Sequence, residues 1–408
     1  ESGQIEIGHE NPAAPFTGLR RILDSFRISK TGSEIPLLGG LVGFVSYEIN
    51  QCFEQQLVGR LRQSAWPLGL YYFVDTLLVF DHFTRRMKLL RLNVAGDSLT
   101  AGGEPLSEAE VRETLLHEVV TPATDPQGAH NGYRSNFQQA DFEQAVVKVQ
   151  DYIHRGDTFQ TVISQREQHQ SAVDPFQVYR SLRMLNPSPY MYFLDFDGLQ
   201  LIGSSPEALV KLKGRQAIVR PIAGTRRRGR DLEDERRMAA ELLHDEKERA
   251  EHVMLVDLAR NDLGRVCEFG SVQTSKMFNL EYYSHVMHMT SIVEGELRAD
   301  HNQFDLFRAA FPAGTVSGAP KPRAMQIIAE LEPEARGPYA GAVGYFSLSG
   351  DLDQCITIRT IVRKDGTYYL QAGAGIVADS VPAQEFLETT NKIAALKEAL
   401  RQSEEGVK

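Results

Sequence analysis

The segment Asp245–Asp262, DEKERAEHVMLVDLARND, decides how the rest of the chain is interpreted. It contains no Gly or Pro and has good helix formers in its first half, so it predicts a helix. Glu248 and Glu251 are three residues apart, which places both carboxylates on one helix face. A second pair at the same spacing, Glu385 and Glu388, lies in PAQEFLETTNK. Two helices that each offer a carboxylate pair predict an all-oxygen site for a hard cation such as Mg²⁺.

Spacing alone leaves a second interpretation open, because Glu pairs at helical spacing are common on solvated helix faces. Four further motifs favour the functional one: PIAGT, TVSGAPK, QAGAGIV and ETTNK. Together with the helix, in this order between about Gly156 and Lys392, they resemble the chorismate-utilising enzymes. Within that family, their details are similar to the large subunit (component I) of the anthranilate synthases. Five linked motifs make a specific signal, where each alone is weak.

Composition restricts the class of protein. The chain has 408 residues, of which 42% are hydrophobic and 24% charged, as in ordinary soluble globular proteins with a large core. A net charge of −10 gives no reason to expect nucleic acid or an anionic membrane as a partner. No apolar run approaches the roughly 18 residues that a membrane helix needs. The scattered cysteines, Cys52, Cys267 and Cys355, suit a reducing cytosol, so we expect a cytoplasmic protein.

The order of expected elements indicates a mixed α/β (α+β) chain. Strands alternate irregularly with helices, and the resemblance implies the chorismate-binding fold, a β-sandwich core of two sheets with helices outside. The Pro- and Gly-containing segment Val119–Gln138 is the predicted boundary between an N-terminal region, residues 1–120, and a catalytic domain, residues 139–405. Component I chains usually begin earlier, so we expect either that the N-terminus is truncated or that disordered residues before it are left out of the numbering. Expected elements include a helix at Thr17–Arg27, strands at Leu41–Tyr47, Leu68–Phe80, Arg86–Leu92, Phe159–Ser164, Tyr190–Phe196, Leu199–Gly203, Leu209–Leu212 and Ala217–Ile222, and helices at Glu108–Glu118, Pro175–Leu185 and Ala383–Ser403.

The resemblance also implies catalytic residues. Glu207, in SSPEALV, matches the general acid that protonates the leaving ring hydroxyl, a role that needs a raised pKa and a fairly dry site. Of two histidines three residues apart, His288 matches the residue that faces the substrate, whereas His285 is expected to be structural. In the PIAGT turn, Gly224 and Thr225 are candidates for holding the substrate, because Gly lets a ligand approach the main chain. The arginines that follow are expected to form a solvated basic loop.

Further matches concern the two carboxylates of chorismate. Tyr339 and Arg359 match substrate contacts, and Arg suits a carboxylate because it can donate two parallel hydrogen bonds. The run Gly373, Ala374 and Gly375 would present main-chain N–H groups to a carboxylate. The resemblance implies Mg²⁺ at the other carboxylate, with Glu251 and Glu388 as its surest ligands and Glu248 and Glu385 nearby. TVSGAPK is expected to form a supporting active-site loop.

Two positions separate the relatives. In aminodeoxychorismate synthases the PIxGT turn carries a nucleophilic Lys, where this chain has Ala223. In isochorismate and salicylate synthases a water-activating Lys stands at the catalytic position of Gln160. The absence of both lysines favours direct attack by ammonia, and hence formation of anthranilate and pyruvate as the first step of tryptophan biosynthesis. An aminodeoxychorismate synthase without the lysine, or a catalytically silent amidotransferase-binding subunit, are the alternatives.

The remaining expectations concern partners and regulation. No Cys-His-Glu amidotransferase arrangement is recognisable, so we expect a separate glutaminase subunit (component II), in a heterotetramer of two large and two small subunits. Pro189, Tyr190 and Met191, in NPSPYMYF, match the segment that lines the tryptophan feedback site of component I. A Pro turn that leads into a buried strand explains the same residues without a ligand.

Overall fold

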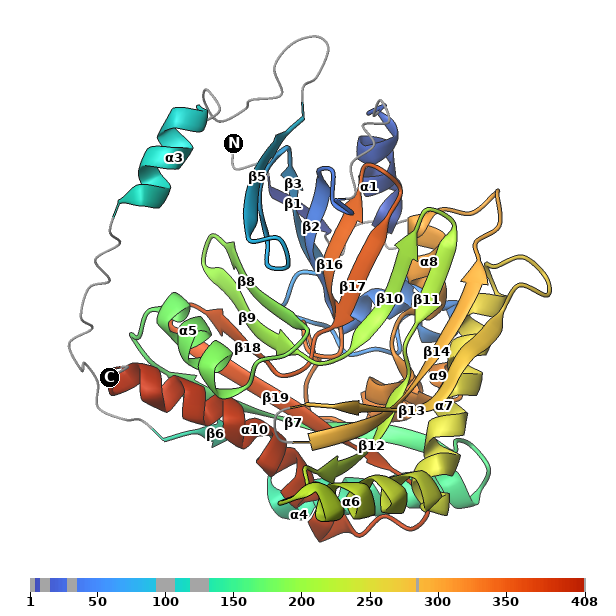
Figure 1. The fold of residues 1–408 in the computed structure, drawn as a ribbon. Helices are drawn as coiled ribbons and strands as arrows, with labels where there is room; N and C mark the ends of the chain where they lie inside the picture. Colours follow the sequence, from blue (N-terminus) through green and yellow to red (C-terminus); the bar gives the residue numbers. More distant parts are fainter. Residues whose placement is uncertain are drawn as a thin grey trace.

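Two antiparallel sheets form the centre of the molecule in the computed structural model, which describes residues 4–7, 15–27, 35–92, 107–117, 132–283 and 286–406 (Figure 1). The larger sheet has ten strands, nine of them in the order β1-β3-β2-β16-β17-β10-β11-β14-β12, with β13 paired to β14. These are β1 (Gln4–Ile7), β2 (Gly40–Val45), β3 (Gly69–Val74), β10 (Ala208–Lys213), β11 (Gln216–Val219), β12 (Ile222–Arg227), β13 (Gln273–Tyr282), β14 (Val286–Glu296), β16 (Ala342–Ser347) and β17 (Leu352–Ile356).

The smaller sheet has seven strands, six of them in the order β15-β7-β19-β18-β9-β8, with β6 paired to β7. They are β6 (Arg134–Ser135), β7 (Gln160–Gln170), β8 (Tyr190–Phe196), β9 (Leu199–Ser205), β15 (Gly318–Ala319), β18 (Thr360–Lys364) and β19 (Thr367–Ile376). A separate hairpin joins β4 (Thr76–Asp81) to β5 (Arg86–Arg91).

Helices cover the outer faces of both sheets, whereas α3 stands apart from them (Figure 1). Their bounds are α1 (Pro15–Asp24), α2 (Asn50–Phe53), α3 (Glu108–Leu116), α4 (Gln139–His154), α5 (Pro175–Leu185), α6 (Leu232–His244), α7 (Glu246–Gly264), α8 (Gln303–Ala310), α9 (Lys321–Leu331) and α10 (Pro382–Glu404). Short 3₁₀ turns lie at η1 (Tyr47–Ile49), η2 (Gln55–Leu57) and η3 (Gly314–Val316). No described helix is both long and apolar enough to cross a membrane. The predicted sandwich with helices outside is confirmed.

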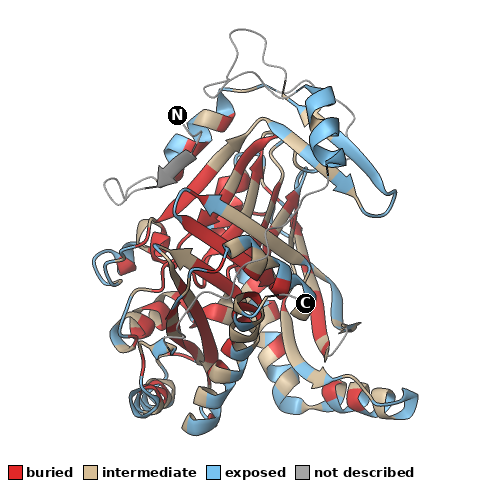
Figure 2. Ribbon diagram, turned by 90° about the vertical axis from the view of Figure 1, so that its left-hand side faces the viewer, coloured by how far each residue is buried: buried red, intermediate tan, exposed pale blue. Residues whose placement is uncertain are grey.

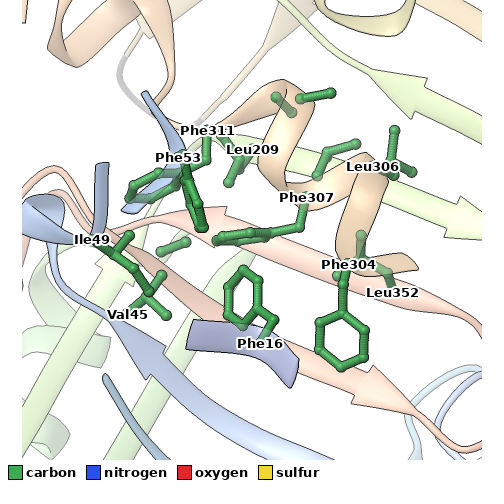
Figure 3. Packing of buried hydrophobic residues seen from close by; sticks show 14 of the residues in the cluster. Phe16, Val45, Ile49, Phe53, Leu209, Phe304, Leu306, Phe307, Phe311 and Leu352 are labelled. Carbon is green, nitrogen blue, oxygen red and sulfur yellow. The ribbon is translucent and has the colours of Figure 1, made fainter. Parts of the chain in front are cut away.

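Apolar packing joins these layers. One cluster contains side chains of both sheets, among them Phe44 and Val343 of the larger and Phe196 and Leu201 of the smaller, and therefore fills the sandwich interior. The largest cluster joins the outer face of the larger sheet to helices: Phe16 packs edge-on against Phe307 of α8, with ring centroids 5.5 Å apart (Figure 3). Figure 2 shows the buried residues concentrated in the central strands, whereas α3 has none.

Most expected elements agree with the structure to within a few residues, and α5 and β8 agree at both ends. The strand expected at Phe159–Ser164 is longer than predicted, because β7 continues to Gln170. Residues Leu68–Phe80, expected as one strand, form β3 and β4, which belong to different sheets. Most of the predicted domain boundary lies outside the described residues, and the two-domain division stays a prediction. Strands β2 and β3 of the N-terminal region are full members of the larger sheet, since β2 pairs with β16 along its whole length.

Candidate active site

The predicted acidic helix is α7, and its first turn is fixed by a side-chain cap. Asp245 precedes the helix, and its Oδ1 accepts hydrogen bonds from the backbone N–H groups of Lys247 and Glu248, each at 3.1 Å. Arg226 of β12 donates to Asp245 Oδ2 at 2.7 Å and to Glu248 Oε1 at 2.9 Å. The expectation of a solvated basic loop is therefore wrong for Arg226, which ties the larger sheet to the start of α7.

The carboxylate pairs of α7 and α10 face a common region. Burial raises the pKa of Glu251, and the nearby carboxylates of Glu248, Glu385 and Glu388 raise it further. Mutual repulsion of this kind arises where carboxylates gather, and a divalent cation would relieve it. Within the described ranges, no three acidic, His or Cys side chains converge closely enough to hold an ion. Carboxylate oxygens are the ligands that Mg²⁺ prefers, so the residue types fit this ion, but their arrangement does not form a closed site and the magnesium site stays a prediction.

The PIAGT motif is a bulged strand, which corrects the expected turn. Its residues belong to β12, whose register against β14 shifts between Ala223 and Thr225. Gly224, at the bulge, has a φ of 68°, a conformation that favours Gly. A Cβ at this position would lie 2.9 Å from Leu242 Cδ1 and 3.1 Å from Glu248 Oε2. The bulge therefore brings the main chain of β12 directly against the acidic helix.

His288 lies on β14, directly opposite Thr225 of β12. Its Nδ1 is 3.0 Å from Thr225 Oγ1 and 3.3 Å from the carbonyl oxygen of Gly224. A carbonyl oxygen only accepts, so we assign the proton of the neutral ring to Nδ1, which leaves Nε2 as the basic nitrogen. Burial lowers the pKa of His288, which favours this neutral form. His285 lies outside the described residues.

Glu207 occupies the connection between β9 and β10. Burial raises its pKa to about 8, against the opposing effects of a hydrogen bond from Thr315 and the charge of Lys392. The bond joins Thr315 Oγ1 to Glu207 Oε1 at 3.0 Å. A carboxyl group that is protonated near neutral pH can donate a proton, as the general-acid prediction requires. Sequence reasoning gave the TVSGAPK loop a supporting role and did not predict that Thr315 contacts the acid.

The predicted GAG element is part of β19, where Gly373, Ala374 and Gly375 pair with Ser164, Ile163 and Val162 of β7. The carbonyl oxygen of Gly373 accepts from Lys392 Nζ at 2.9 Å, on the side away from β7. In an antiparallel strand the N–H and C=O of one residue point to the same side, and alternate residues share that side. The Gly373 and Gly375 N–H groups therefore face the site, whereas Ala374 bonds to β7.

Close packing explains the small residues of this strand. A Cβ on Gly373 would lie 2.8 Å from Tyr339 Oη, and one on Gly375 would lie 2.5 Å from Gln160 Nε2. The structure thus brings Gln160 and Tyr339 to the two glycines, as the sequence predicted for a shared site. Tyr339 is buried, and burial raises its pKa to about 12, so its hydroxyl is protonated at neutral pH.

Arg359 interacts electrostatically with Tyr339, Glu388 and His288. Burial lowers its pKa, whereas the nearby Tyr339 and Glu388 raise it, and its charge in turn acts on His288. Its Nη1 donates to the carbonyl oxygen of Lys392 at 3.0 Å, and its φ is 50°, in the left-handed region. Lys392 Nζ lies 2.5 Å from Glu388 Oε1. Sequence reasoning missed Lys392 as a site residue, although its spacing of four residues from Glu388 was a readable signal.

Pro189, Tyr190 and Met191 line a separate pocket of about 420 Å³ between the sheets. Its wall also includes Arg220 and Tyr283. Tyr190 Oη donates to Asp353 Oδ1 at 2.9 Å, so part of the wall is polar and charged. The three residues predicted for an inhibitor therefore share one cavity, while their ligand stays a prediction.

Comparison with known proteins agrees with this geometry. The model of the chorismate binding enzyme family matches residues 4–398. Anthranilate synthase component 1 of Aquifex aeolicus is 47% identical, over 96% of this chain and 80% of the relative. The protein of the same name from Acetivibrio thermocellus is 44% identical, over 96% of this chain and 81% of the relative. The crystal structure of anthranilate synthase component I from Streptococcus pneumoniae is 37% identical, with a TM-score of 0.84 over 96% of this chain and 89% of that one.

The menaquinone-specific isochorismate synthase of Escherichia coli, 22% identical with a TM-score of 0.73 over 93% of this chain and 82% of that one, shares the fold. The resemblance drawn from the motifs is confirmed at the level of component I. These matches span nearly the whole chain, which therefore belongs to the chorismate binding enzyme family.

Proposed function

We propose that this chain converts chorismate and ammonia into anthranilate and pyruvate, as the large subunit of an anthranilate synthase. Its near full-length similarity to component I proteins supports the activity. The observation that carries the choice of reaction is that burial raises the pKa of Glu207 and lowers that of His288, in a chain whose positions 160 and 223 are Gln and Ala.

The acid and the base have separate tasks in this reaction. Ammonia adds at C2 of the ring as the C4 hydroxyl departs, and the Glu207 carboxyl donates the proton that lets it leave as water. The C2 proton and the enolpyruvyl group are then lost, which makes the ring aromatic and releases pyruvate. His288 Nε2 is the available base for the C2 proton, because its Nδ1 is occupied by Gly224 and Thr225. The two pKa shifts have opposite directions, so both groups are in their working form at neutral pH.

The charged groups bind the two carboxylates of the substrate. Arg359, with the N–H groups of Gly373 and Gly375, is suited to the enolpyruvyl carboxylate. Glu251 and Glu388 would hold Mg²⁺, with Glu248 and Glu385 nearby, at the ring carboxylate. When bound there, the ion would withdraw electrons from the ring and so favour departure of the hydroxyl.

The two alternatives have less support. An aminodeoxychorismate synthase of the lysine-dependent kind needs an amine at position 223, which is Ala. The amine of Lys392 is engaged by Glu388 and by the Gly373 carbonyl oxygen. A silent subunit would have no need for clustered carboxylates that repel one another and raise the pKa of Glu251.

The remaining proposals concern nitrogen supply and regulation. We expect free ammonium to support turnover by the isolated chain, and glutamine to do so only with a separate glutaminase subunit, in a cytoplasmic heterotetramer of two large and two small subunits. The pocket of Pro189, Tyr190 and Met191 is the proposed site for tryptophan, whose indole suits its aromatic wall.

Product identification tests the proposal. Purified chain is incubated with chorismate, Mg²⁺ and ammonium, and the products are separated by chromatography with fluorescence detection of anthranilate. We expect anthranilate and pyruvate in equal amounts, with isochorismate as a minor product at most. Aminodeoxychorismate as the main product would identify the first alternative, and no turnover of chorismate by folded protein would identify the second.

A further inference from the structure

His288 stands in a row of three side chains that crosses the larger sheet. Strand β14 lies between β12 and β13, and His288 is directly opposite Thr225 on one side and Glu281 on the other. Residues directly opposite each other in antiparallel strands project from the same face, with Cβ atoms about 4.5–5.5 Å apart. Glu281 is therefore the carboxylate neighbour of the proposed base, on the side that Thr225 leaves free.

Two other side chains hold Glu281. Its Oε1 is paired with the guanidinium of Arg220, and its Oε2 accepts a hydrogen bond from Tyr283 Oη at 3.1 Å. The Tyr283 ring also contacts the His288 ring edge-on, with centroids 5.5 Å apart. The carboxylate is thus fixed by a cation and a phenol, and the phenol packs on the imidazole.

We propose that Glu281 is a positioning residue for His288: its carboxylate, fixed by Arg220 and Tyr283, stabilises the protonated imidazole formed when His288 takes a proton from the substrate. The inference rests on the proposed function, in which His288 is the proton acceptor. It assigns to Glu281 the task of a carboxylate that acts on a catalytic histidine without touching the substrate.

The charged and polar groups around His288 come from each of the elements that pack against it. Glu281 on β13 and the Gly224 carbonyl on β12 raise its pKa, whereas Arg359 and burial lower it. Thr225 and Tyr283 are neutral contacts at physiological pH. Glu281 is therefore the carboxylate that opposes Arg359 at this ring.

A purely structural ion pair is the competing explanation, because the Arg220 and Glu281 side chains are 38% and 26% exposed. Such pairs contribute about 0–1 kcal/mol to stability, and removing either partner then has the same effect. A positioning role for Glu281 instead predicts that the two substitutions have opposite effects on the pKa of His288. Glu281→Gln removes the anion beside His288, whereas Arg220→Gln removes the cation that offsets this anion, so the two changes shift the titration of His288 in opposite directions.

The test is a titration of the His288 ring by NMR in protein labelled at the histidine Cε1, with His288→Gln to assign the signal. We expect the midpoint to move to lower pH in Glu281→Gln and to higher pH in Arg220→Gln. The acid limb of kcat/KM should move in the same directions, with less than about a fivefold change in turnover at neutral pH. Asp157→Asn is the matched control, because its pair with Arg323 has similar exposures of 30% and 36% and neither residue is among the groups that shift the pKa of His288.

Shifts in the same direction in both variants, or none in either, would overturn the proposal. Opposite shifts in the NMR titration with a fixed acid limb would also overturn it, because Glu281 would then act on His288 without consequence for the reaction. The NMR arm needs no turnover, so a chain that titrates as expected but forms no anthranilate would refute the proposed function and not the placement of Glu281. Circular dichroism and thermal melting establish that each variant is folded before it is scored.

Discussion

Charged side chains are paired and buried to different extents on the two sides of the site. On one side, which we call the closed side, Glu332 and Arg336 are 3% and 2% exposed, and every charge is paired within the fold. Arg336 also donates to the carbonyl oxygens of Val316 and Val162, at 2.6 and 2.8 Å. The other, acidic side consists of the glutamates of α7 and α10. These are half-buried or exposed, and there burial and neighbouring carboxylates raise the pKa of Glu251.

The difference indicates what each side is for. The closed side fixes geometry: Arg336 lies against the rings of Tyr47 and Tyr339, and its bond to Val316 holds the residue beside Thr315. On the acidic side Arg226 pairs with Glu248 and Lys392 with Glu388, but burial and the neighbouring carboxylates still raise the pKa of Glu251, which fits the proposed Mg²⁺ site. We therefore expect charge removal to destabilise the protein on the closed side and to reduce activity without destabilising it on the acidic side.

The largest effect is expected at Glu207, which Thr315 links to the closed side. Glu207→Gln removes the general acid and should lower kcat/KM by about 10²–10⁴-fold. In the wild type, the fall of kcat/KM at alkaline pH (the alkaline limb) should have its midpoint near pH 8, because burial raises the pKa of Glu207 to about 8 and activity falls as this acid deprotonates. The variant should lose this limb, measured as kcat/KM for chorismate between pH 6 and 9 (roughly the range that brackets both groups). A variant that keeps the limb would show that another group is the acid.

Arg336→Met should cause the next largest change, on the closed side. It leaves Glu332 as an unpaired buried charge, which costs about 3–5 kcal/mol in free energy of unfolding, measured by urea denaturation. Arg323→Met is the control, since its partner pair is about one-third exposed and should be worth less than about 1 kcal/mol. Adding Glu332→Gln to Arg336→Met should restore part of the loss, because the orphaned charge is then removed. Equal losses in Arg323→Met and Arg336→Met would contradict the contrast between the two sides.

Glu251→Gln and Glu388→Gln test the acidic side, because each removes one of its negative charges. Each keeps the size of the side chain but removes an anionic ligand, so turnover should fall by more than about 100-fold, since even partners beyond the ligand shell cost about 10–100-fold. Thermal stability should not fall in Glu251→Gln, because the folded-state pKa of Glu251 is raised and its charge therefore opposes folding. Mg²⁺ affinity is measured by calorimetry in the same variants. Full activity in either would refute the metal assignment.

Sequence reasoning reached most of the fold because its signals are local. The helix α7 follows from its helix formers and the absence of Gly and Pro, and the structure adds the Asp245 cap that fixes its start. The predicted bounds of α5 are those of the structure, which shows that Asp174 caps it. The sandwich itself came from resemblance, since alternation of strands and helices does not specify which strands pair. The bulge at Gly224 was missed for the same reason: a Gly in a strand and a Gly in a turn look alike until the partner strand β14 is known.

Candidate site residues could be named where a motif carried them, and their roles stay predictions. The groups that tune them could not be named in this way. Thr315 is 108 residues from Glu207 along the chain. Glu281 is close to His288 in the sequence, but the two lie side by side only because β13 pairs with β14, a pairing that the sequence analysis did not predict. Arg226 looked like one of three solvated arginines until the fold brought it to Asp245. Chemistry that depends on a long-range neighbour leaves no spacing signal in one sequence.

The smallest effect tests one such neighbour. The Thr315 hydroxyl donates to Glu207 and stabilises its ionised form, so it lowers the pKa that burial raises. Thr315→Val keeps the shape of the side chain and removes one hydrogen bond, worth about 1 kcal/mol. The pKa of Glu207 should then rise, which moves the alkaline limb of kcat/KM above that of the wild type. Turnover at neutral pH should change less than about tenfold, because Glu207 is already protonated there. Thr315→Ser, which retains the hydroxyl, should leave the limb in place. A limb that moves to lower pH in Thr315→Val would mean that the Thr315 hydroxyl accepts a hydrogen bond from the protonated Glu207 carboxyl group and so favours the acid form.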